Sequence, residues 1–164
     1  MHLFEDAKVV SAFVPVDMQG AQDGDWVSLK GFRYCDVLIF KAVGTASDDP
    51  VISFRQATAV AGTSAKDFAK IERIYKQEQL LLTTSDTQTV TTQAAGASYS
   101  ASATSAESCA IYGFHIDASQ LDVTNGFDCI QVRVADTGSN AQLGCGLYIL
   151  SGQRYSNSLS AIAN

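Results

Sequence analysis

The sequence predicts an all-β fold, an antiparallel β-sandwich of about eight strands with a jelly-roll-like order. Apolar residues recur at every second position in several short segments between Val9 and Leu150, which is the period of a strand with one buried face. Turn-forming residues separate these segments, as at 44–50 and at Asn125-Gly126, and no segment has the length and periodicity of a substantial helix. An immunoglobulin-like or tail-tube-like sandwich is the alternative, because alternation within strands does not determine their order.

Composition limits the classes of partner. The chain has 164 residues, of which 17% are charged, and a net charge of −6, so we expect one domain over 1–164. Nucleic-acid binding requires clustered Lys and Arg, and we therefore expect no direct nucleic-acid partner. No apolar run approaches the ~20 residues that span a bilayer, so no membrane partner is expected. Residues 1–6 lack the basic and apolar regions of a secretory signal, so we expect none.

The first half of the chain supplies four expected strands. Val9–Val16 contains Pro15 near its end, which is typical of an edge strand or of the end of a strand. Tyr34–Lys41 has a continuous apolar centre, which is typical of a strand covered on both faces. Shorter alternating segments, at 26–29 and 51–58, complete the set.

Lys70–Gln77 fits two structures. Ile71, Ile74 and Tyr75 have a helical spacing, whereas Ile71, Arg73 and Tyr75 have the spacing of a strand. Because the segment is short and its neighbours are strands, we predict a strand. Its lysines and Arg73, with Lys66, are interpreted as a solvated face rather than an anion site.

Residues 93–108 are a low-complexity segment of mostly Ala, Ser, Thr, Gly and Gln, with a single charge and a single aromatic residue, Tyr99. Such a composition predicts a long loop or arm, which either orders on a partner or stays a solvent loop without one. Segments 1–8 and 156–164 are interpreted as flexible ends. The candidate interaction residues are therefore Tyr99 in the arm and Leu3 and Phe4 at the N-terminal end.

The remainder of the chain begins with an expected strand, Cys109–Asp117, and a helical turn at 118–121 capped by Asp117. Segments 129–135 and 143–150 then alternate on either side of the polar stretch 136–140, which predicts a hairpin at the centre of a sheet. The expected core residues of this hairpin are Ile130, Val132, Val134, Leu143, Leu147 and Ile149.

We find no pattern that predicts catalysis or metal binding. Cys35, Cys109, Cys129 and Cys145 are far apart in sequence and lie in apolar segments, so we expect four reduced, buried thiols rather than disulfides or a zinc site. His115 has only Asp117 near it in sequence and is interpreted as a half-exposed strand residue. Acidic pairs at 48–49 and 23/25 are interpreted as turns rather than cation ligands. We therefore expect no catalytic, metal or cofactor residues and no enzymatic activity.

Four segments, FVPVDMQGAQDGDWVSLKGF, DPVISFRQATAVAGTSAKDF, IERIYKQE and LDVTNGFDCIQVRVADTGSNAQLGCGLYILSGQRY, resemble small virion proteins of tailed double-stranded-DNA bacteriophages. The resemblance implies a head decoration (cement) or auxiliary head protein with a jelly-roll-like fold. It also implies binding to the lattice of the major capsid protein of the same phage, homo-oligomers on the capsid, synthesis in the bacterial cytoplasm and a final location in the virion. A tail or neck component is one alternative. A host-glycan-binding sandwich is another, with Trp26, Tyr99, Tyr148 or Tyr155 as its aromatic platform.

Overall fold

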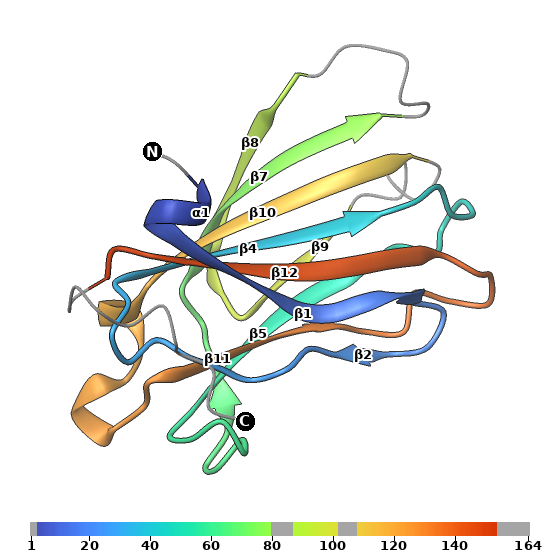
Figure 1. The fold of residues 1–164 in the computed structure, drawn as a ribbon. Coiled ribbons are helices and arrows are strands. Elements are labelled where there is room, and N and C mark those ends of the chain that lie inside the picture. The colour runs from blue at the N-terminus through green and yellow to red at the C-terminus, as the bar shows by residue number, and fades with distance from the viewer. Residues whose placement is uncertain (1–2, 80–86, 102–107, 154–164) are drawn as a thin grey trace.

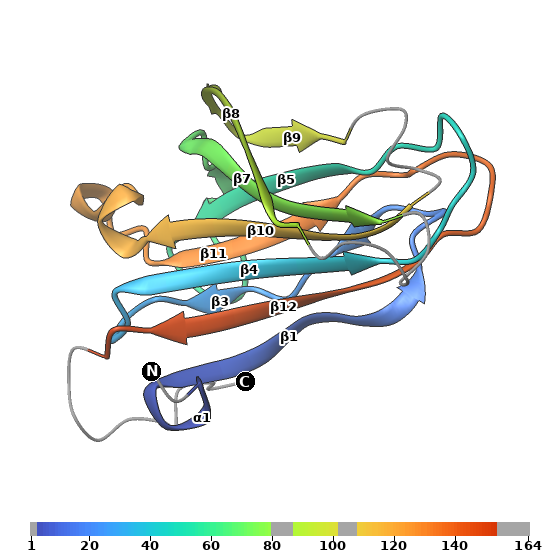
Figure 2. The same ribbon diagram turned by 90° about the horizontal axis from the view of Figure 1, so that it is seen from above.

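The computed structural model describes residues 3–79, 87–101 and 108–153, which form two antiparallel sheets packed face to face (Figures 1 and 2). Sheet A has the order β1-β12-β4-β10-β7-β8, and sheet B has the order β2-β11-β5-β6 with β3 beside β11 and β9 beside β5. The strands of sheet A are β1 (Ala7–Asp17), β4 (Tyr34–Lys41), β7 (Ile71–Gln79), β8 (Thr89–Gly96), β10 (Cys109–Asp117) and β12 (Leu143–Ser151). Those of sheet B are β2 (Gln22–Asp23), β3 (Val27–Ser28), β5 (Val51–Ala57), β6 (Lys66–Asp67), β9 (Ser98–Ser100) and β11 (Cys129–Val134). Single helical turns are α1 (Leu3–Asp6), η1 (Ala118–Gln120) and η2 (Val123–Asn125).

The strand order is that of a jelly roll. Eight strands form four antiparallel pairs: β1 with β12, β2 with β11, β4 with β10 and β5 with β6. The first strand of the chain pairs with the last, the next pairs with the last but one, and so on inward along the chain. The pairs β1–β12 and β4–β10 lie in sheet A, and the other two lie in sheet B. This nested arrangement is a long hairpin rolled into two sheets, so the predicted fold class is confirmed. Strands β7 and β8 extend sheet A beyond the roll.

The core lies between the two sheets. Val37 and Ile39 of β4 face Phe54 of β5 and Val132 of β11, and all four are almost fully buried. Tyr148 of β12 joins the two sheets, because its hydroxyl donates a hydrogen bond to the Asp25 carbonyl and accepts one from the Val132 N–H, each at 2.9 Å. Burial raises the pKa of this hydroxyl, so the phenol stays protonated and donates.

The predicted hairpin between 129–135 and 143–150 is wrong. Both segments are strands, but β11 belongs to sheet B and β12 to sheet A, so residues 135–142 cross from one sheet to the other. Alternation with a polar connection fits either a hairpin or such a crossing. The choice depends on the distant partners, β5 for β11 and β4 for β12.

The core face of β12 was also predicted wrongly. Ile130, Val132 and Val134 of β11 are buried as expected, but Leu143 is 60% exposed, and Leu147 and Ile149 are half-buried. The face that points into the core carries Gly144, Gly146, Tyr148 and Leu150. Both faces are apolar, and Met18 and Phe13 occupy the space above the two glycines. The core therefore needs small residues there.

Two local predictions are confirmed. The ambiguous segment 70–77 is a strand, β7, which pairs with β10 and β8. The turn after β10 is the 3₁₀ helix η1. Its N-cap residue Asp117 accepts a 2.8 Å hydrogen bond from the Ser119 N–H, and this bond lowers the pKa of the Asp117 carboxyl.

The expected low-complexity arm is partly a strand region. Strands β8 and β9 occupy most of 93–101, and residues 102–107 lie outside the described residues. Tyr99 is only 7% exposed, and its ring lies 5.8 Å from that of Tyr112 and 6.3 Å from that of Phe114. Tyr99 is thus a core residue, not the exposed anchor that was predicted. Pairing with β5 places it there, although its small neighbours contribute little to the core.

The chain ends and the cysteines need smaller corrections. Ala7 and Lys8 are paired strand residues of β1, so the irregular N-terminal segment is shorter than 1–8, and the predicted tail at 156–164 lies outside the described residues. All four cysteines are free thiols, as predicted. Cys35 and Cys129 are buried, but Cys109 and Cys145 are partly exposed, which contradicts the prediction that all four are buried.

Candidate functional site

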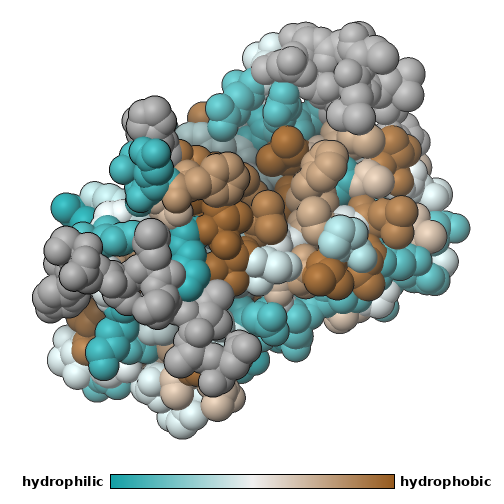
Figure 3. All heavy atoms as spheres, in the orientation of Figure 1, coloured by the Kyte–Doolittle hydropathy of each residue, from teal (hydrophilic) through white to brown (hydrophobic). Residues whose placement is uncertain are grey.

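The outer face of sheet A is apolar across most of its width. Val37 and Ile39 point into the core, so Leu38 and Phe40 point outward, and strand pairing places outward residues of neighbouring strands in the same rows. We define the docking face as the apolar members of these rows: Val9, Leu38, Phe40, Tyr75, Val90, Ile111, Cys145, Leu147 and Ile149. Figure 3 shows apolar side chains gathered over the middle of sheet A.

This face explains the continuous apolar centre of β4. The sequence predicts that β4 is covered on both faces, and sheet B covers the inner one. Among the described residues nothing of comparable extent covers the outer one, where Phe40 is 44% exposed and Ile111 38% exposed. An uncovered apolar sheet face in a water-exposed position is typical of a surface that binds another molecule.

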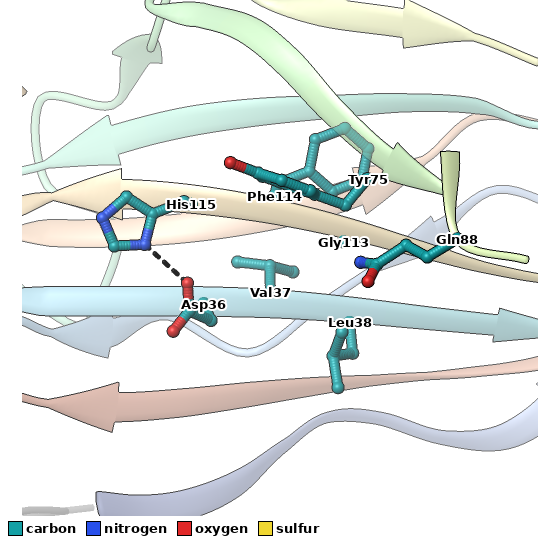
Figure 4. A pocket seen from close by; sticks show the side chains of 8 residues that line it. All are labelled: Asp36, Val37, Leu38, Tyr75, Gln88, Gly113, Phe114 and His115. Atoms are coloured by element: carbon teal, nitrogen blue, oxygen red, sulfur yellow. Dashed lines mark hydrogen bonds and ion pairs between the residues drawn. The ribbon is translucent and has the colours of Figure 1, made fainter. Parts of the chain in front are cut away.

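A depression lies within the docking face at Gly113 (Figure 4). It has a volume of about 270 Å³, and its lining includes Leu38, Tyr75 and Gln88 around Gly113. A Cβ atom at Gly113 would lie 3.4 Å from the Tyr75 Cβ and 3.6 Å from the Leu38 Cδ2, so the missing side chain leaves the space open. The depression is large enough for an apolar side chain, because a cavity of about 150 Å³ binds benzene.

One polar pair stands at the edge of this depression. His115 of β10 and Asp36 of β4 are directly opposite in the sheet, and the His115 Nδ1 lies 2.6 Å from the Asp36 Oδ1. The Tyr34 ring lies 5.2 Å from the imidazole ring. Nucleophilic catalysis by such a pair would need a hydroxyl or thiol beside the other imidazole nitrogen, and the residues that line the depression contribute only the Tyr75 phenol.

Asp36 was not predicted as the partner of His115. Asp117, two residues away on the same face, was the predicted neighbour, but Asp117 caps η1 and lies 3.7 Å from the Arg33 guanidinium. The register between β4 and β10 brings Asp36 to His115. A strand register between segments 79 residues apart cannot be derived from alternation alone.

In each acidic pair proposed from the sequence, one carboxylate has a structural partner. Asp23 pairs with Arg133, and Asp48 accepts hydrogen bonds from the backbone and side chain of Asn140 at 3.1 and 2.9 Å. Among residues 3–79, 87–101 and 108–153, no group of three or more His, Cys, Asp or Glu could hold a metal ion. In the basic segment, Lys66 pairs with Asp122, and the Lys76 Nζ lies 3.0 Å from the Glu78 Oε2. The pairing of Lys76 with Glu78 fits a basic segment balanced by its own acidic neighbours, whereas Lys66 pairs with the distant Asp122.

Of the three candidate interaction residues, two remain exposed. Phe4 is 81% exposed and Leu3 38% exposed, both in α1 beside the first residues of β1 (Figures 1 and 2). Their role in binding stays a prediction. The predicted site did not include Leu38, Phe40, Gly113 or Tyr75, and the best available signal was the continuous apolar run in β4.

Comparisons with known proteins yield one likeness. No family model matches the chain, and no curated protein matches it. Among solved structures, the chain is similar to the SPBc2 prophage-derived protein YomS, with 10% sequence identity and a TM-score of 0.41 over 88% of this chain and 93% of that one. In the part of the chain that the structure describes, no helix has the length and apolar character needed to cross a membrane.

Proposed function

We propose that this chain is a non-enzymatic structural protein of a bacteriophage virion, which decorates and stabilises the capsid by binding the major capsid protein lattice through its docking face. The uncovered apolar outer face of sheet A carries the proposal. The phage origin and the capsid as partner come from the resemblance of the four sequence segments. The docking mode comes from the geometry.

The size of the face suits a modest protein contact. Six strands spaced about 4.8 Å apart, with about three rows of outward residues, give a face of roughly 25 by 20 Å, or about 500 Å². A standard protein interface buries about 800 Å² on each partner, so this face supplies most of one side. Many copies on a symmetric shell would tolerate a modest affinity for each contact, because the contacts act together.

The depression at Gly113 gives this contact a central anchor point. Interfaces concentrate binding free energy where a side chain of one partner fills a desolvated pocket of the other. We assign the depression to an apolar side chain of the capsid protein, with the His115–Asp36 pair at its rim available for hydrogen bonding.

The same docking face would serve a tail or neck component, so the choice of partner rests on the binding assay. The glycan-binding alternative loses support, because Tyr99 and Tyr148 are buried and Trp26 is half-buried. Tyr155, the fourth candidate for an aromatic platform, lies outside the described residues.

The test compares binding of purified protein to empty heads and to purified tails by cosedimentation. Ile111→Lys places a charge on the docking face, and Val60→Lys places one on a somewhat more exposed valine in the β5–β6 connection, away from sheet A. We expect Ile111→Lys to weaken binding to heads by about tenfold or more, which corresponds to 1.4 kcal/mol, and Val60→Lys to leave it unchanged. Equal effects of the two variants would contradict the docking face, and binding to tails alone would contradict the capsid.

Gly113→Ala tests the depression itself. The added methyl group occupies the depression at ordinary contact distances from Tyr75 and Leu38. Because glycine is unfavourable inside a strand, the variant should be at least as stable as the original chain. We expect weaker binding to heads together with unchanged or higher stability, and an unchanged affinity would remove the depression from the contact.

A further inference from the structure

The strand edges of the described residues differ in how they are protected from pairing with other chains. Edge strand β1 contains Pro15, Lys8 and two irregularities in its pairing with β12. On the two sides of sheet B, β2, β3 and β6 have two residues each and β9 has three. Prolines, charges, bulges and shortness are the features that prevent edge-to-edge association.

Strand β8, at the other edge of sheet A, lacks most of these features. Its eight residues, TVTTQAAG, include no charge and no proline. Thr89–Thr92 pair regularly with β7, and an irregularity follows, where the Gln93 side chain donates hydrogen bonds to the carbonyls of Ile71 and Ser98 at 3.1 and 2.9 Å. Among the described residues, no strand pairs with Thr89–Thr92 on the edge that faces away from β7. This side therefore presents backbone groups that another strand can bind.

We propose that β8 pairs antiparallel with β8 of a second copy of this chain, with the two-fold axis at Val90. A two-fold axis normal to the sheet keeps outer residues on the outer face, so an outer residue must lie opposite another outer residue. Val90 is an outer residue, because it pairs with Tyr75, which lies in the row of Gly113 and Leu38. With the axis at Val90, the two Val90 side chains face each other and Thr89 lies opposite Thr91.

The absence of charge in β8 favours a second copy over a different partner. A two-fold contact places every group near the same group of the other copy, so a charged edge would repel itself. The chain carries a net charge of −6, yet β8 contributes nothing to it. Val90 is 47% exposed and would become covered, and valine and threonine are favourable residues for strand pairing.

The pairing joins two docking faces into one. Tyr75 and Val90 end the row of outward residues that crosses sheet A through Leu38 and Gly113. Across the two-fold axis, this row continues with Val90 and Tyr75 of the second copy. The dimer would therefore present a face about twice as wide, with two depressions. The advantage of a wider docking face rests on the proposed function, whereas the pairing of the two β8 strands does not.

The experiment measures the oligomeric state by sedimentation velocity, without any capsid. We expect the unmodified protein to dimerise with a dissociation constant of about 1 mM or lower. Copies that are held close together reach effective concentrations in this range, so such an affinity would be sufficient for pairing. Val90→Lys and Val90→Glu should each weaken dimerisation by at least about tenfold, and an equimolar mixture of the two should restore it, because opposite charges then face each other. Val60→Lys, at a valine of 46% exposure, is the matched control and should dimerise like the unmodified protein.

Each other result overturns the proposal. A monomer throughout this concentration range excludes the pairing, and dimers that tolerate both Val90 variants place the contact elsewhere. Failure of the mixture to restore dimers excludes an axis at Val90. Circular dichroism of each variant confirms that it remains folded. Because no capsid is present, these outcomes are independent of whether the docking face binds heads.

Discussion

Replacing Gly146 by alanine should destabilise the fold, although alanine suits a strand better than glycine does. Gly146 points into the core, and a Cβ atom there would lie 2.5 Å from the Phe13 Cε1 and 3.1 Å from the Ile39 Cδ1. Real Cβ atoms do not approach another heavy atom to 2.5 Å, so the Phe13 ring must move. Phe13 is itself buried against β12, which limits that movement.

The expected magnitude is the difference between two effects. Overpacking of a core costs about 1–3 kcal/mol, and replacement of glycine inside a strand gains about 0.5–1 kcal/mol. The midpoints of these ranges give a net loss in the free energy of unfolding of about 1 kcal/mol, with an upper limit of about 2.5 kcal/mol. Gly144→Ala is the matched comparison, because its Cβ meets the flexible end of Met18 at 2.6 Å, and a thioether can move aside. It should cost less than Gly146→Ala.

Urea denaturation of both variants, with and without Phe13→Leu, measures the effect. A leucine removes the ring edge that the new methyl group meets, so Gly146→Ala should cost at least about 1 kcal/mol less in that background, and Gly144→Ala should be unaffected by it. A neutral Gly146→Ala would refute the argument. An equal cost in both backgrounds would also refute it, because the loss would then not arise at Phe13.

Other predictions concern the joined sheets, the two faces of the strands and the thiols. Tyr148→Phe leaves the Val132 N–H without its partner and should cost about 1–3 kcal/mol in urea denaturation, and no loss would contradict this role of the hydroxyl. Ile130→Ala should cost about 2–5 kcal/mol because Ile130 is fully buried, whereas half-buried Leu147→Ala should cost clearly less, and equal losses would contradict the assignment of faces. In thiol titration of the native protein, Cys109 and Cys145 should react before Cys35 and Cys129, and four thiols should react after denaturation without reductant. Burial, with Asp128 nearby, raises the pKa of Cys129 from 9.0 to about 12, so the thiol ionises at a lower pH in the unfolded chain than in the folded one. The free energy of unfolding should therefore fall as pH rises from 9.0 to about 12, and it should fall less steeply in Cys129→Ala.

Alternation was sufficient for the strands with regular apolar periodicity, such as β4, β5, β10, β11 and β12, but not for their faces where both faces are apolar. In β11, Ile130, Val132 and Val134 alternate with polar Gln131 and Arg133, and the predicted core face is correct. In β12, Leu147 and Tyr148 are both apolar, so the period of two does not distinguish the inner face from the outer one. The distinguishing residues are Phe13 and Met18, which lie more than 120 positions away in the chain.

The same limit explains the errors about Tyr99 and the hairpin. Composition describes a segment by its own residues, and 93–108 has too few large apolar residues to form a core by itself. Tyr99 is buried because β5 and β10 supply the other side chains around it. Likewise, the position of β12 beside β4 rather than β11 is a property of the whole roll. Neither result depends on local pattern.

Strand β12, whose core face was predicted wrongly, contributes to the docking face, and there is a physical reason. A strand in a two-layer sandwich needs one apolar face, so Leu38 and Phe40 on β4 and Leu147 on β12 exceed what the core requires. Their outward side chains stabilise the fold only through neighbours on the same face, and surface substitutions away from the core usually change stability by less than about 0.5 kcal/mol. If charged replacements on this face leave stability nearly unchanged, folding does not account for its apolar character. A contact outside the described residues then must account for it, which is the condition that the docking proposal requires.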